Sequence, residues 1–352
     1  MNEALARLGW TPERDNEFEP LRADGLFPAR IAVEHRSAYV AYTEHGELRA
    51  ELAGRLRHED RWPAVGDWVG MRPPATVAEL LPRATVFSRK EPWLAAKEQV
   101  LAANADTVLV TTALTPTDFK PRRLERYLAT AWESGAQPAI VLTKTDLCPD
   151  VDSAVLQVEA IAFGVPIHAV NGLTGEGVDQ LRAYFAGDRT IALLGSSGVG
   201  KSTIVNHLVG RALMPTAEIG EDGRGRHTTR HRELILLPGG GLVLDTPGLR
   251  ELQLWDVGDG LEQTFEDVVE LATRCRFSDC SHKSEPGCAI RAALSDGSLP
   301  RDRYASWQKL QRELERLERK LDSRARSEYG QQIRRNARQR RRTQRPPRRH
   351  AR

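Results

Sequence analysis

A phosphate-binding motif lies in the middle of the chain. Residues 195–202 read Gly-Ser-Ser-Gly-Val-Gly-Lys-Ser and match G-x-x-x-x-G-K-[ST] in full, which defines a P-loop. In such a loop, backbone N–H groups and a helix N-terminus bind phosphate, Lys201 reaches the β- and γ-phosphates, and the Ser202 hydroxyl ligates Mg²⁺. The alternative is a glycine-rich turn that ends in Lys-Ser by chance. The predicted phosphate-binding residues are Gly195, Ser196, Ser197, Gly198, Val199, Gly200, Lys201, Ser202 and Thr203.

A second motif has the chemistry to select the base. Residues 143–146 read Thr-Lys-Thr-Asp and follow an apolar run that predicts a buried strand. An [NT]-K-x-D tetrad at a strand end is typical of guanine sites, because the fixed carboxylate accepts hydrogen bonds from N1–H and the 2-amino group. Adenine would leave that carboxylate unpaired, so Asp146 is expected to reject ATP. An ordinary strand-to-loop turn is the alternative. The predicted base-binding residues are Thr143, Lys144, Thr145 and Asp146.

Two further segments are expected to sense the γ-phosphate and its metal. Residues 245–248 read Asp-Thr-Pro-Gly and follow a predicted strand. Asp245 would hold the water shell of Mg²⁺, and Gly248 would sense the γ-phosphate. Residues 211–230 lack a buried pattern and are expected to form a switch loop, from which the Thr229 hydroxyl joins Ser202 at Mg²⁺.

The usual residue for orienting the attacking water is missing from this sequence. Many GTPases use a glutamine near the glycine of this motif, but Leu249 follows Gly248 here. Since Leu249 cannot hydrogen-bond to water, either another group does so or hydrolysis is slow until a partner completes the site. His227 is the nearest candidate, and a solvated loop histidine is the equal alternative. The predicted catalytic residues are Lys201, His227 and Thr229.

Three of the four cysteines cluster with a histidine. Cys275, Cys280, His282 and Cys288 form a C-x₄-C-x-H-x₅-C pattern. Three thiolates and one imidazole complete a tetrahedral set for one structural Zn²⁺ and leave no open position for catalysis. A group of free buried cysteines is the alternative. Cys148, beside the guanine tetrad, is interpreted as a packing residue.

The elements around the nucleotide motifs predict a mostly parallel sheet with helices on both faces, because strands and helices alternate. The tetrad comes about fifty residues before the P-loop, whereas ordinary GTPases have the opposite order, so this domain is expected to be circularly permuted. The predicted strands are 107–112, 139–142, 166–170, 190–194, 233–237 and 241–244, and the predicted helices are 121–134, 153–163, 178–185 and 203–209.

The two ends of the chain have different patterns. Short alternating strands at 29–34, 38–43, 47–52 and 68–71 suit a small barrel such as an OB-fold, which often binds RNA; a structural β-domain without a ligand is the other interpretation. Near the C-terminus, apolar residues make one stripe on a charged helix, too short for a stable coiled coil, so a monomer is expected. That stripe consists of Trp307, Leu310, Leu314, Leu317 and Leu321.

The net charge of +3 conceals an asymmetry. No acidic residue follows Glu328, while ten arginines fall between Arg334 and Arg352. Such a tail is expected to be disordered and attracted to RNA, with a merely solubilising tail as the alternative. The absence of an 18-residue apolar run and of a signal-peptide pattern predicts a cytoplasmic protein with no membrane partner.

These patterns together predict a multidomain protein with an OB-like β-barrel, a circularly permuted α/β P-loop GTPase domain and a C-terminal helical zinc-binding domain. The expected boundaries are 1–24 for an N-terminal extension, 25–90 for the barrel, 91–255 for the GTPase domain, 256–330 for the zinc-binding domain and 331–352 for the Arg-rich tail.

This assembly resembles the RsgA family of GTPases of small ribosomal subunit biogenesis. Three further stretches support the resemblance: Val-Gly-Asp-Trp-Val at 65–69, Glu-Gln-Val-Leu-Ala-Ala-Asn-Ala-Asp at 98–106, and Arg-His-Thr-Thr at 226–229. The resemblance implies binding to the immature small subunit in the GTP form, with rRNA contacts from the barrel and the zinc-binding domain. It also implies that the subunit stimulates hydrolysis, which then releases this protein and other assembly factors, with His227 as a substitute for glutamine.

Two positions depart from the family pattern. Thr143 stands where asparagine is commoner, and Asn171-Gly172 stands where a Ser-Ala type of loop would complete the base site. Leu249 leaves a second function open, in which the chain is an RNA-binding scaffold whose guanine nucleotide is structural and scarcely hydrolysed. A P-loop enzyme that uses ATP, such as a kinase, is disfavoured by Asp146.

Overall fold

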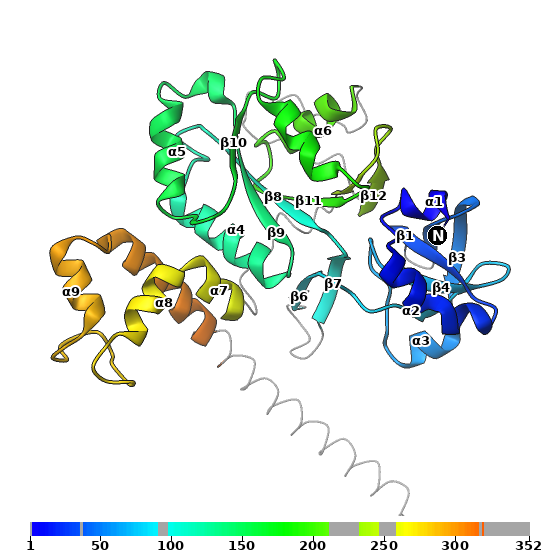
Figure 1. The fold of residues 1–352 in the computed structure, drawn as a ribbon, viewed down its shortest axis with the longest axis horizontal. Coiled ribbons are helices and arrows are strands. Elements are labelled where there is room, and N and C mark those ends of the chain that lie inside the picture. Colours follow the sequence, from blue (N-terminus) through cyan, green and yellow to red (C-terminus); the bar gives the residue numbers. More distant parts are fainter. Residues whose placement is uncertain are drawn as a thin grey trace, which may run out of the picture.

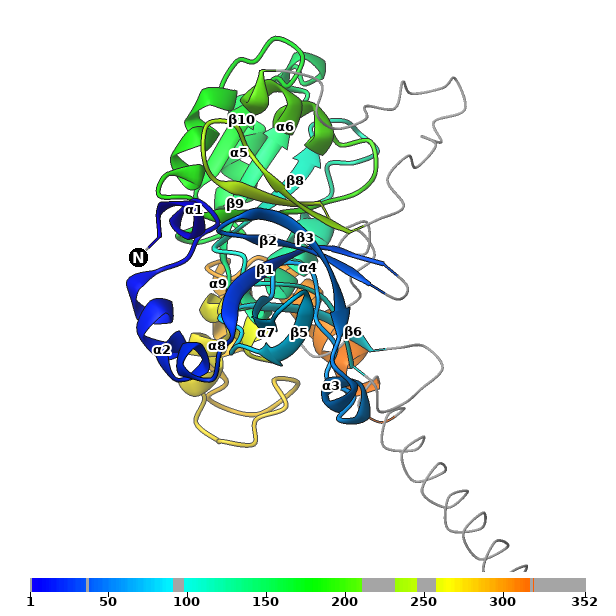
Figure 2. The same cartoon turned by 90° about the vertical axis from the view of Figure 1, so that its right-hand side faces the viewer.

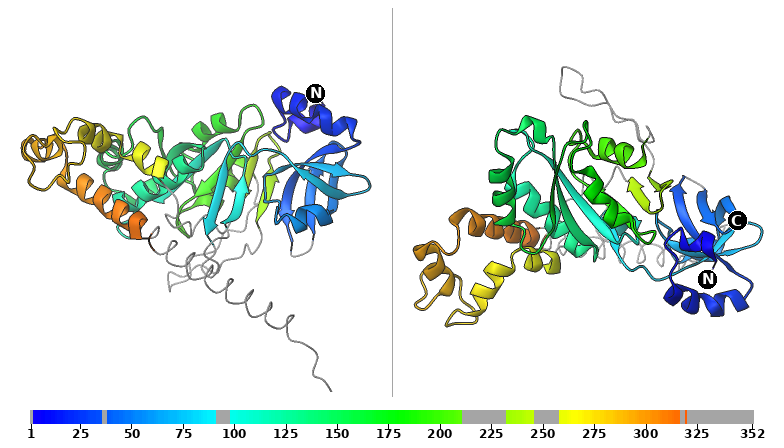
Figure 3. Two further views of the ribbon diagram at one scale, coloured as in Figure 1. Left: turned by 90° about the horizontal axis from the view of Figure 1, so that it is seen from below. Right: turned by 45° about the horizontal axis from the view of Figure 1, so that its top comes forward.

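The structure is a computed structural model that describes residues 2–35, 38–90, 98–210, 232–245 and 258–316, together with Arg319. Three parts follow one another in space (Figures 1 and 3): a barrel at one end, an α/β domain in the centre and a helical domain at the other end. The central domain therefore contacts both of its neighbours, while the barrel and the helical domain lie apart.

The N-terminal part is a closed five-stranded barrel with two helices along one side (Figure 2). Its strand order is β1-β2-β3-β5-β4, and β4 pairs back with β1. Within this barrel β3 and β5 are parallel and the other pairs are antiparallel. This is the predicted OB-like barrel. Its elements are α1 (Glu3–Ala6), α2 (Pro12–Ala23), β1 (Phe27–Glu34), β2 (Tyr39–Thr43), β3 (Gly46–Leu52), α3 (Gly54–His58), β4 (Trp68–Arg72) and β5 (Thr76–Leu80).

Residues 2–24, predicted as an N-terminal extension, form the helices α1 and α2, which pack against the barrel. The rings of Trp10 and Phe18 meet edge to face at 5.7 Å, and Trp10 also meets Trp68 of β4. All three rings are at most 2% exposed. Burial of these rings fixes α2 on the barrel, since each aromatic side chain removes a large apolar area from water. The strand β5 has no counterpart in the prediction.

The central domain has the strand order β10-β9-β8-β11-β13-β12. Neighbouring strands are parallel except β12 and β13. Apolar residues cover both faces, as expected of a sheet buried on both sides. Its elements are β8 (Thr107–Ala113), α4 (Pro121–Glu133), β9 (Gln137–Thr143), η1 (Thr145–Leu147), α5 (Val151–Glu159), β10 (Ile167–Val170), η2 (Val178–Phe185), β11 (Thr190–Leu194), α6 (Lys201–Val209), β12 (Glu233–Leu236) and β13 (Leu242–Asp245). The helix predicted at 178–185 is the 3₁₀-helix η2.

Alternate residues of each strand face opposite helices. Val108 and Val110 of β8 belong to the core shared with α4 and α5. Leu109, between them, belongs to the core shared with η2 and α6. The P-loop strand β11 divides in the same way. The sheet thus holds the strand ends that carry the predicted nucleotide motifs in one fixed plane.

The barrel and the central domain share one continuous sheet, because β12 pairs with β1. Tyr42 Oη donates to the Leu234 carbonyl at 3.1 Å, and Arg232 forms an ion pair with Glu34 at 3.0 Å. The strand that follows the predicted switch loop is therefore attached directly to the barrel. A separate ribbon, β6 (Val86–Lys90) with β7 (Glu98–Ala103), contacts the barrel through a bridge between Val65 and Ala102.

A buried arginine fastens the same joint. Arg30 of β1 is 1% exposed, and its guanidinium donates to the carbonyls of Leu8, Gly66 and Asn104. Burial lowers the Arg30 pKa. These three acceptors belong to the N-terminal segment, the barrel and the entry to the central domain. Two of the stretches that indicated the family, 65–69 and 98–106, thus meet in space and hold the barrel in place.

The C-terminal part contains α7 (Gly258–Thr264), α8 (Glu266–Thr273), α9 (Ala289–Asp296) and a helix at 301–316. Phe265, Val268 and Ile290 are fully buried in its core. Trp307 and Leu310 of the predicted stripe also pack there, and Leu314 contacts it. Leu317 and Leu321 lie outside the described residues. Among the described helices, none has the length and hydropathy needed to cross a membrane.

Candidate guanine-nucleotide and metal sites

The P-loop follows the buried strand β11 and ends in α6, as its sequence predicts. Gly200 caps the helix with φ +98°, a left-handed conformation that favours glycine. A Cβ at Gly195 would lie 2.2 Å from the Thr111 carbonyl oxygen of the neighbouring strand β8. Glycine at position 195 lets the loop begin in contact with β8. The backbone geometry thus explains why glycine stands at both positions.

Lys201 lies inside the loop. Its ammonium donates to the carbonyls of Gly195 at 2.6 Å and Ser196 at 2.5 Å, and the residue is 6% exposed. A buried ammonium needs such partners, since an unpaired charge in the interior is costly. The loop thus holds a positive charge at its centre, where phosphate oxygens would be attracted.

The base-binding tetrad touches the P-loop. Thr143 ends β9, is 2% exposed, and donates from Oγ1 to the Val199 carbonyl at 2.6 Å. Lys144 takes a left-handed conformation with φ +57°, and Asp146 is exposed in the turn that follows. The structure therefore brings together two motifs that are 56 residues apart and gives the Thr143 hydroxyl a specific contact.

The Asn171–Gly172 loop lies on the same side of the domain. Asn171 Oδ1 accepts hydrogen bonds from the backbone N–H groups of Leu173 and Thr174. Gly172 faces Thr203, which stands in the first turn of α6. The Asn171 side chain thus holds the loop closed, and Leu173 is 82% exposed at its tip.

Asp245 ends β13, which is parallel to β11. Because parallel strands present their carboxyl ends at one edge, the 5% exposed Asp245 belongs to the same edge as the P-loop. His227, Thr229 and Gly248 lie outside the described residues.

Two residues of α4 contact the P-loop, and the sequence did not single them out for this role. Tyr127 Oη lies 3.1 Å from Ser196 Oγ, and Arg123 Nη1 lies 3.3 Å from the same oxygen. The motif itself gives no sign of this support, because Tyr127 appears only as part of the apolar face of a helix. The second position of the P-loop is therefore held from outside the motif.

The opposite side of α4 holds the C-terminal domain. Glu125 pairs with Arg303 at 2.9 Å and accepts a hydrogen bond from the Ser306 hydroxyl. Arg303 also pairs with Asp267 at 2.9 Å. Burial raises the Glu125 pKa, against the opposing effect of its hydrogen bonds to Ser306 and Arg303. One helix thus contacts both the P-loop and the C-terminal domain.

The predicted metal ligands converge. The ligand atoms of Cys275, Cys280, His282 and Cys288 all lie within 4.8 Å of one another. His282 Nδ1 is 3.5 Å from the sulfurs of Cys275 and Cys288. Three sulfurs and one imidazole nitrogen at these separations fit one tetrahedral Zn²⁺.

Neighbouring groups shift the thiols of this cluster in opposite directions, since burial raises the pKa of Cys280 to about 11 while the pKa of Cys275 falls. Desolvation is the largest influence on the Cys275 thiol and acts to raise its pKa. Hydrogen bonds from the backbone N–H groups of Ile290 and Ala289 and contacts with the other thiols outweigh it, so the net change in pKa is downward. Glu285 accepts hydrogen bonds from the backbone N–H groups of Ser281 and Lys283, which flank His282. These contacts shape the ligand loop without adding a ligand.

Comparisons with known proteins agree with this geometry. The model of the RsgA GTPase family matches residues 80–255. A small ribosomal subunit biogenesis GTPase RsgA from Opitutus terrae is 46% identical over 90% of this chain and 92% of its own length. One from Streptomyces coelicolor is 45% identical over 95% of this chain and 93% of its own length.

Solved structures show the same architecture. YjeQ from Thermotoga maritima is 26% identical with a TM-score of 0.64, covering 82% of this chain and 98% of that protein. YloQ, described as a circularly permuted GTPase, is 25% identical with a TM-score of 0.58, covering 82% and 95%. The predicted permutation is confirmed. With this order of motifs, this fold and these relatives, the chain belongs to the RsgA GTPase family.

Proposed function

We propose that this GTPase binds GTP with Mg²⁺ and hydrolyses it while bound to the small ribosomal subunit. Its relatives are named for the biogenesis of that subunit. The observation that carries the nucleotide part is the Thr143–Val199 hydrogen bond, which couples the base-binding tetrad to the P-loop. Its proposed partners are therefore the small ribosomal subunit and the nucleotides GTP and GDP.

The proposed roles follow from position. The loop from Gly195 to Thr203 binds the phosphates, and Lys201 neutralises their charge. Ser202 and Thr229 ligate Mg²⁺, and Asp245 holds its water shell. Bound Mg²⁺ neutralises charge on the phosphate oxygens. The buried Asp245 at the strand edge and the hydroxyl in the first turn of α6 suit a hard cation that prefers oxygen ligands.

Guanine selection is assigned to residues 143–146, with Asp146 as the acceptor for N1–H and the 2-amino group. The neighbouring Asn171–Gly172 loop, with Leu173 82% exposed at its tip, is proposed to complete the base site. His227 is proposed to orient water and Gly248 to sense the γ-phosphate.

The cysteine cluster is proposed to hold one structural Zn²⁺. The core around Phe265 and Ile290 is small, and such a domain gains much of its stability from a metal. The ligands leave no free position in a tetrahedral set, so the ion shapes the domain and takes no part in hydrolysis.

The proposed domains are the N-terminal extension at 1–24, the barrel at 25–90, the GTPase domain at 91–255, the zinc-binding domain at 256–330 and the Arg-rich tail at 331–352. The barrel and the zinc-binding domain would contact rRNA from opposite ends of the GTPase domain (Figure 3). Stimulated hydrolysis would time the release of this protein and of other assembly factors. The protein would act as a monomer in the cytoplasm. The pairing of β12 with both β1 and β13 would transmit changes at the nucleotide edge, where β13 ends in Asp245, to the barrel.

GTP turnover by purified protein, alone and with isolated small or large subunits, tests this function. A large stimulation by the small subunit alone, abolished in Lys201→Ala, supports it. Leu249 favours a second candidate, a scaffold with a structural nucleotide. Tight GTP binding and subunit binding without stimulated turnover would establish the scaffold instead.

A further inference from the structure

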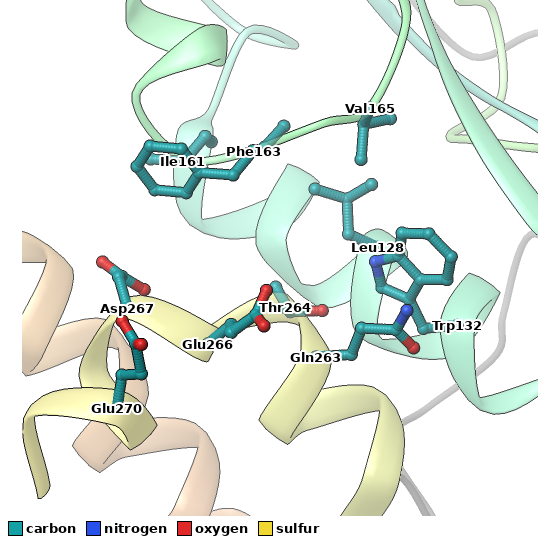
Figure 4. A pocket seen from close by; sticks show the side chains of 11 residues that line it. Leu128, Trp132, Ile161, Phe163, Val165, Gln263, Thr264, Glu266, Asp267 and Glu270 are labelled. Atoms are coloured by element: carbon teal, nitrogen blue, oxygen red, sulfur yellow. The ribbon is translucent and has the colours of Figure 1, made fainter.

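A cavity of about 210 Å³ lies between α4, the segment that follows α5, and the α7–α8 region (Figure 4). Leu128 and Trp132 line it from α4, and Phe163 lines it from the segment after α5. Glu266 and Glu270 line the facing side, on α8. The volume is below the roughly 300–1,000 Å³ of small-molecule sites, so it suits one large side chain of a peptide.

The two sides of the cavity differ in chemistry. Phe163 is 63% exposed, although it is a large aromatic residue. Figure 4 shows its ring and the Trp132 indole on different sides of the space, with the carboxylates of Asp267 and Glu270 at a third side. An apolar cavity for a neutral ligand would not need acidic residues along one wall.

The three carboxylates on the acidic side of the cavity differ in their ion pairs. Asp267 is committed to Arg303 at 2.9 Å. Glu270 lies 3.5 Å from Arg274, with both side chains more than 60% exposed, so that pair contributes little. Glu266 forms no ion pair with any residue that the structure describes. Two carboxylates of α8 are therefore available to a cation.

We infer that this cavity binds an arginine side chain, and that its occupant is the Arg-rich C-terminal segment of the same chain, residues 334–352. A guanidinium stacks on aromatic faces and pairs with carboxylates through a planar fork, and the two walls supply these partners. The segment carries ten arginines and no acidic residue. This inference concerns a site outside the nucleotide and metal sites and does not depend on the proposed function.

The chain is long enough for this contact. The helix at 301–316 starts at the cavity, where Arg303 donates to the carbonyls of Ile161 and Thr264. The distance back from residue 316 is about 20 Å at 1.5 Å per helical residue. Arg334 lies eighteen positions after residue 316, a stretch that spans up to about 60 Å when extended. An attached segment also competes at an effective concentration on the order of millimolar.

Occupation of the cavity would have a consequence for RNA binding. Arginines held by carboxylates are withheld from phosphate, so the cavity and an RNA backbone would compete for one segment. The C-terminal segment would then contact RNA most strongly when the cavity releases it.

The test uses a fluorescent peptide of residues 331–352 and two full-length proteins. One is the wild type, and the other has the ten C-terminal arginines replaced by glutamine. Fluorescence anisotropy should show the peptide binding the glutamine-tailed protein at least tenfold more tightly, because its cavity is not filled from within. Equal binding to both proteins would contradict the inference that the C-terminal segment occupies the cavity. No binding to the glutamine-tailed protein would contradict the inference that the cavity binds arginine.

Substitutions in the cavity locate the binding. In the glutamine-tailed protein, Phe163→Ala and the double variant Glu266→Gln with Glu270→Gln should each weaken the peptide about tenfold. The matched controls are Leu156→Ala, an apolar side chain that is 65% exposed on α5, and Glu262→Gln, an exposed carboxylate on α7. Neither lines the cavity. A peptide with lysine in place of every arginine should bind several-fold more weakly. Equal losses of peptide affinity in the cavity variants and in the control variants would contradict the inference.

Discussion

Tyr127 Oη lies 3.1 Å from Ser196 Oγ and joins α4 to the second residue of the P-loop. On the same helix, Glu125 holds Arg303 of the C-terminal domain. The helix α4 is thus the shared wall between the nucleotide loop and the metal-binding domain.

The variant Tyr127→Phe removes the hydroxyl and keeps the ring. Since a typical hydrogen bond contributes about 1 kcal/mol, GTP affinity should fall roughly fivefold, while the melting temperature changes little. Tyr184→Phe is the matched control, because its hydroxyl contacts His168 at 2.8 Å, away from the P-loop. Titration with a fluorescent GTP analogue measures both, and equal losses would contradict a specific role for Tyr127.

Glu125→Gln should reveal an unusual pH dependence. One guanidinium, that of Arg303, serves two carboxylates, Glu125 and Asp267, so the cluster carries excess negative charge. Burial raises the Glu125 pKa in the folded state above the value of about 4.5 expected when unfolded. Protonated Glu125 is therefore the form that favours the folded state. Its contribution to the free energy of unfolding is fully present below pH 4.5 and is lost as pH rises through the folded pKa.

Urea unfolding of wild type and Glu125→Gln at several pH values measures this effect. The free energy of unfolding of the wild type, relative to the variant, should decline from pH 4 to pH 7. A relative free energy that grows with pH would mean that the ion pair with Arg303 outweighs burial.

Asp146→Asn should change the base that is bound. The amide lacks the charge that accepts from N1–H and the 2-amino group, so GTP affinity should fall by roughly 100-fold or more. The amide can instead donate to the C2 oxygen of xanthine, and xanthosine triphosphate should bind more tightly than GTP. Asp150→Asn, which alters the N-cap of α5, is the control and should leave GTP preferred. Competition binding with the two nucleotides distinguishes these outcomes.

Loss of the metal should unfold the C-terminal domain alone. Cys275→Ser should lower bound zinc from about one per chain to near zero and speed hydrogen exchange across residues 258–316, while GTP binding persists. Cys148→Ser, in the loop after the tetrad, should keep its zinc. Metal analysis and exchange mass spectrometry provide the measurements. Unchanged exchange after zinc loss would show that the apolar core suffices.

Gly66→Ala should weaken the joint between barrel and GTPase domain. Gly66 has φ +91°, and a Cβ there would lie 2.1 Å from the Ala103 carbonyl oxygen. Strain and displacement together should cost about 3 kcal/mol in the free energy of unfolding. Gly54→Ala is the control, because no atom lies within 4 Å of its Cβ position. Denaturant unfolding compares them, and equal stability would mean that the joint adapts.

The sequence by itself determined the features whose residues are neighbours along the chain. The P-loop, the tetrad and the Cys-Cys-His-Cys pattern each lie within a short segment, and the strand and helix around the P-loop follow from local apolar patterns. The order of the motifs also predicted the circular permutation. The β5 strand was missed because Val77 and Ala78 are buried side by side, so its residues do not alternate between buried and exposed positions.

Only the tertiary structure decided how these segments support one another. Tyr127 and Ser196 are 69 residues apart, and Arg303 and Glu125 are 178 apart. Neither pair can be recognised from the local sequence pattern. The pattern places Tyr127 on the apolar face of a helix, but it does not show whether its hydroxyl meets the hydrophobic core or the P-loop. Which faces meet depends on how whole elements pack, and that is decided by the burial of many side chains at once.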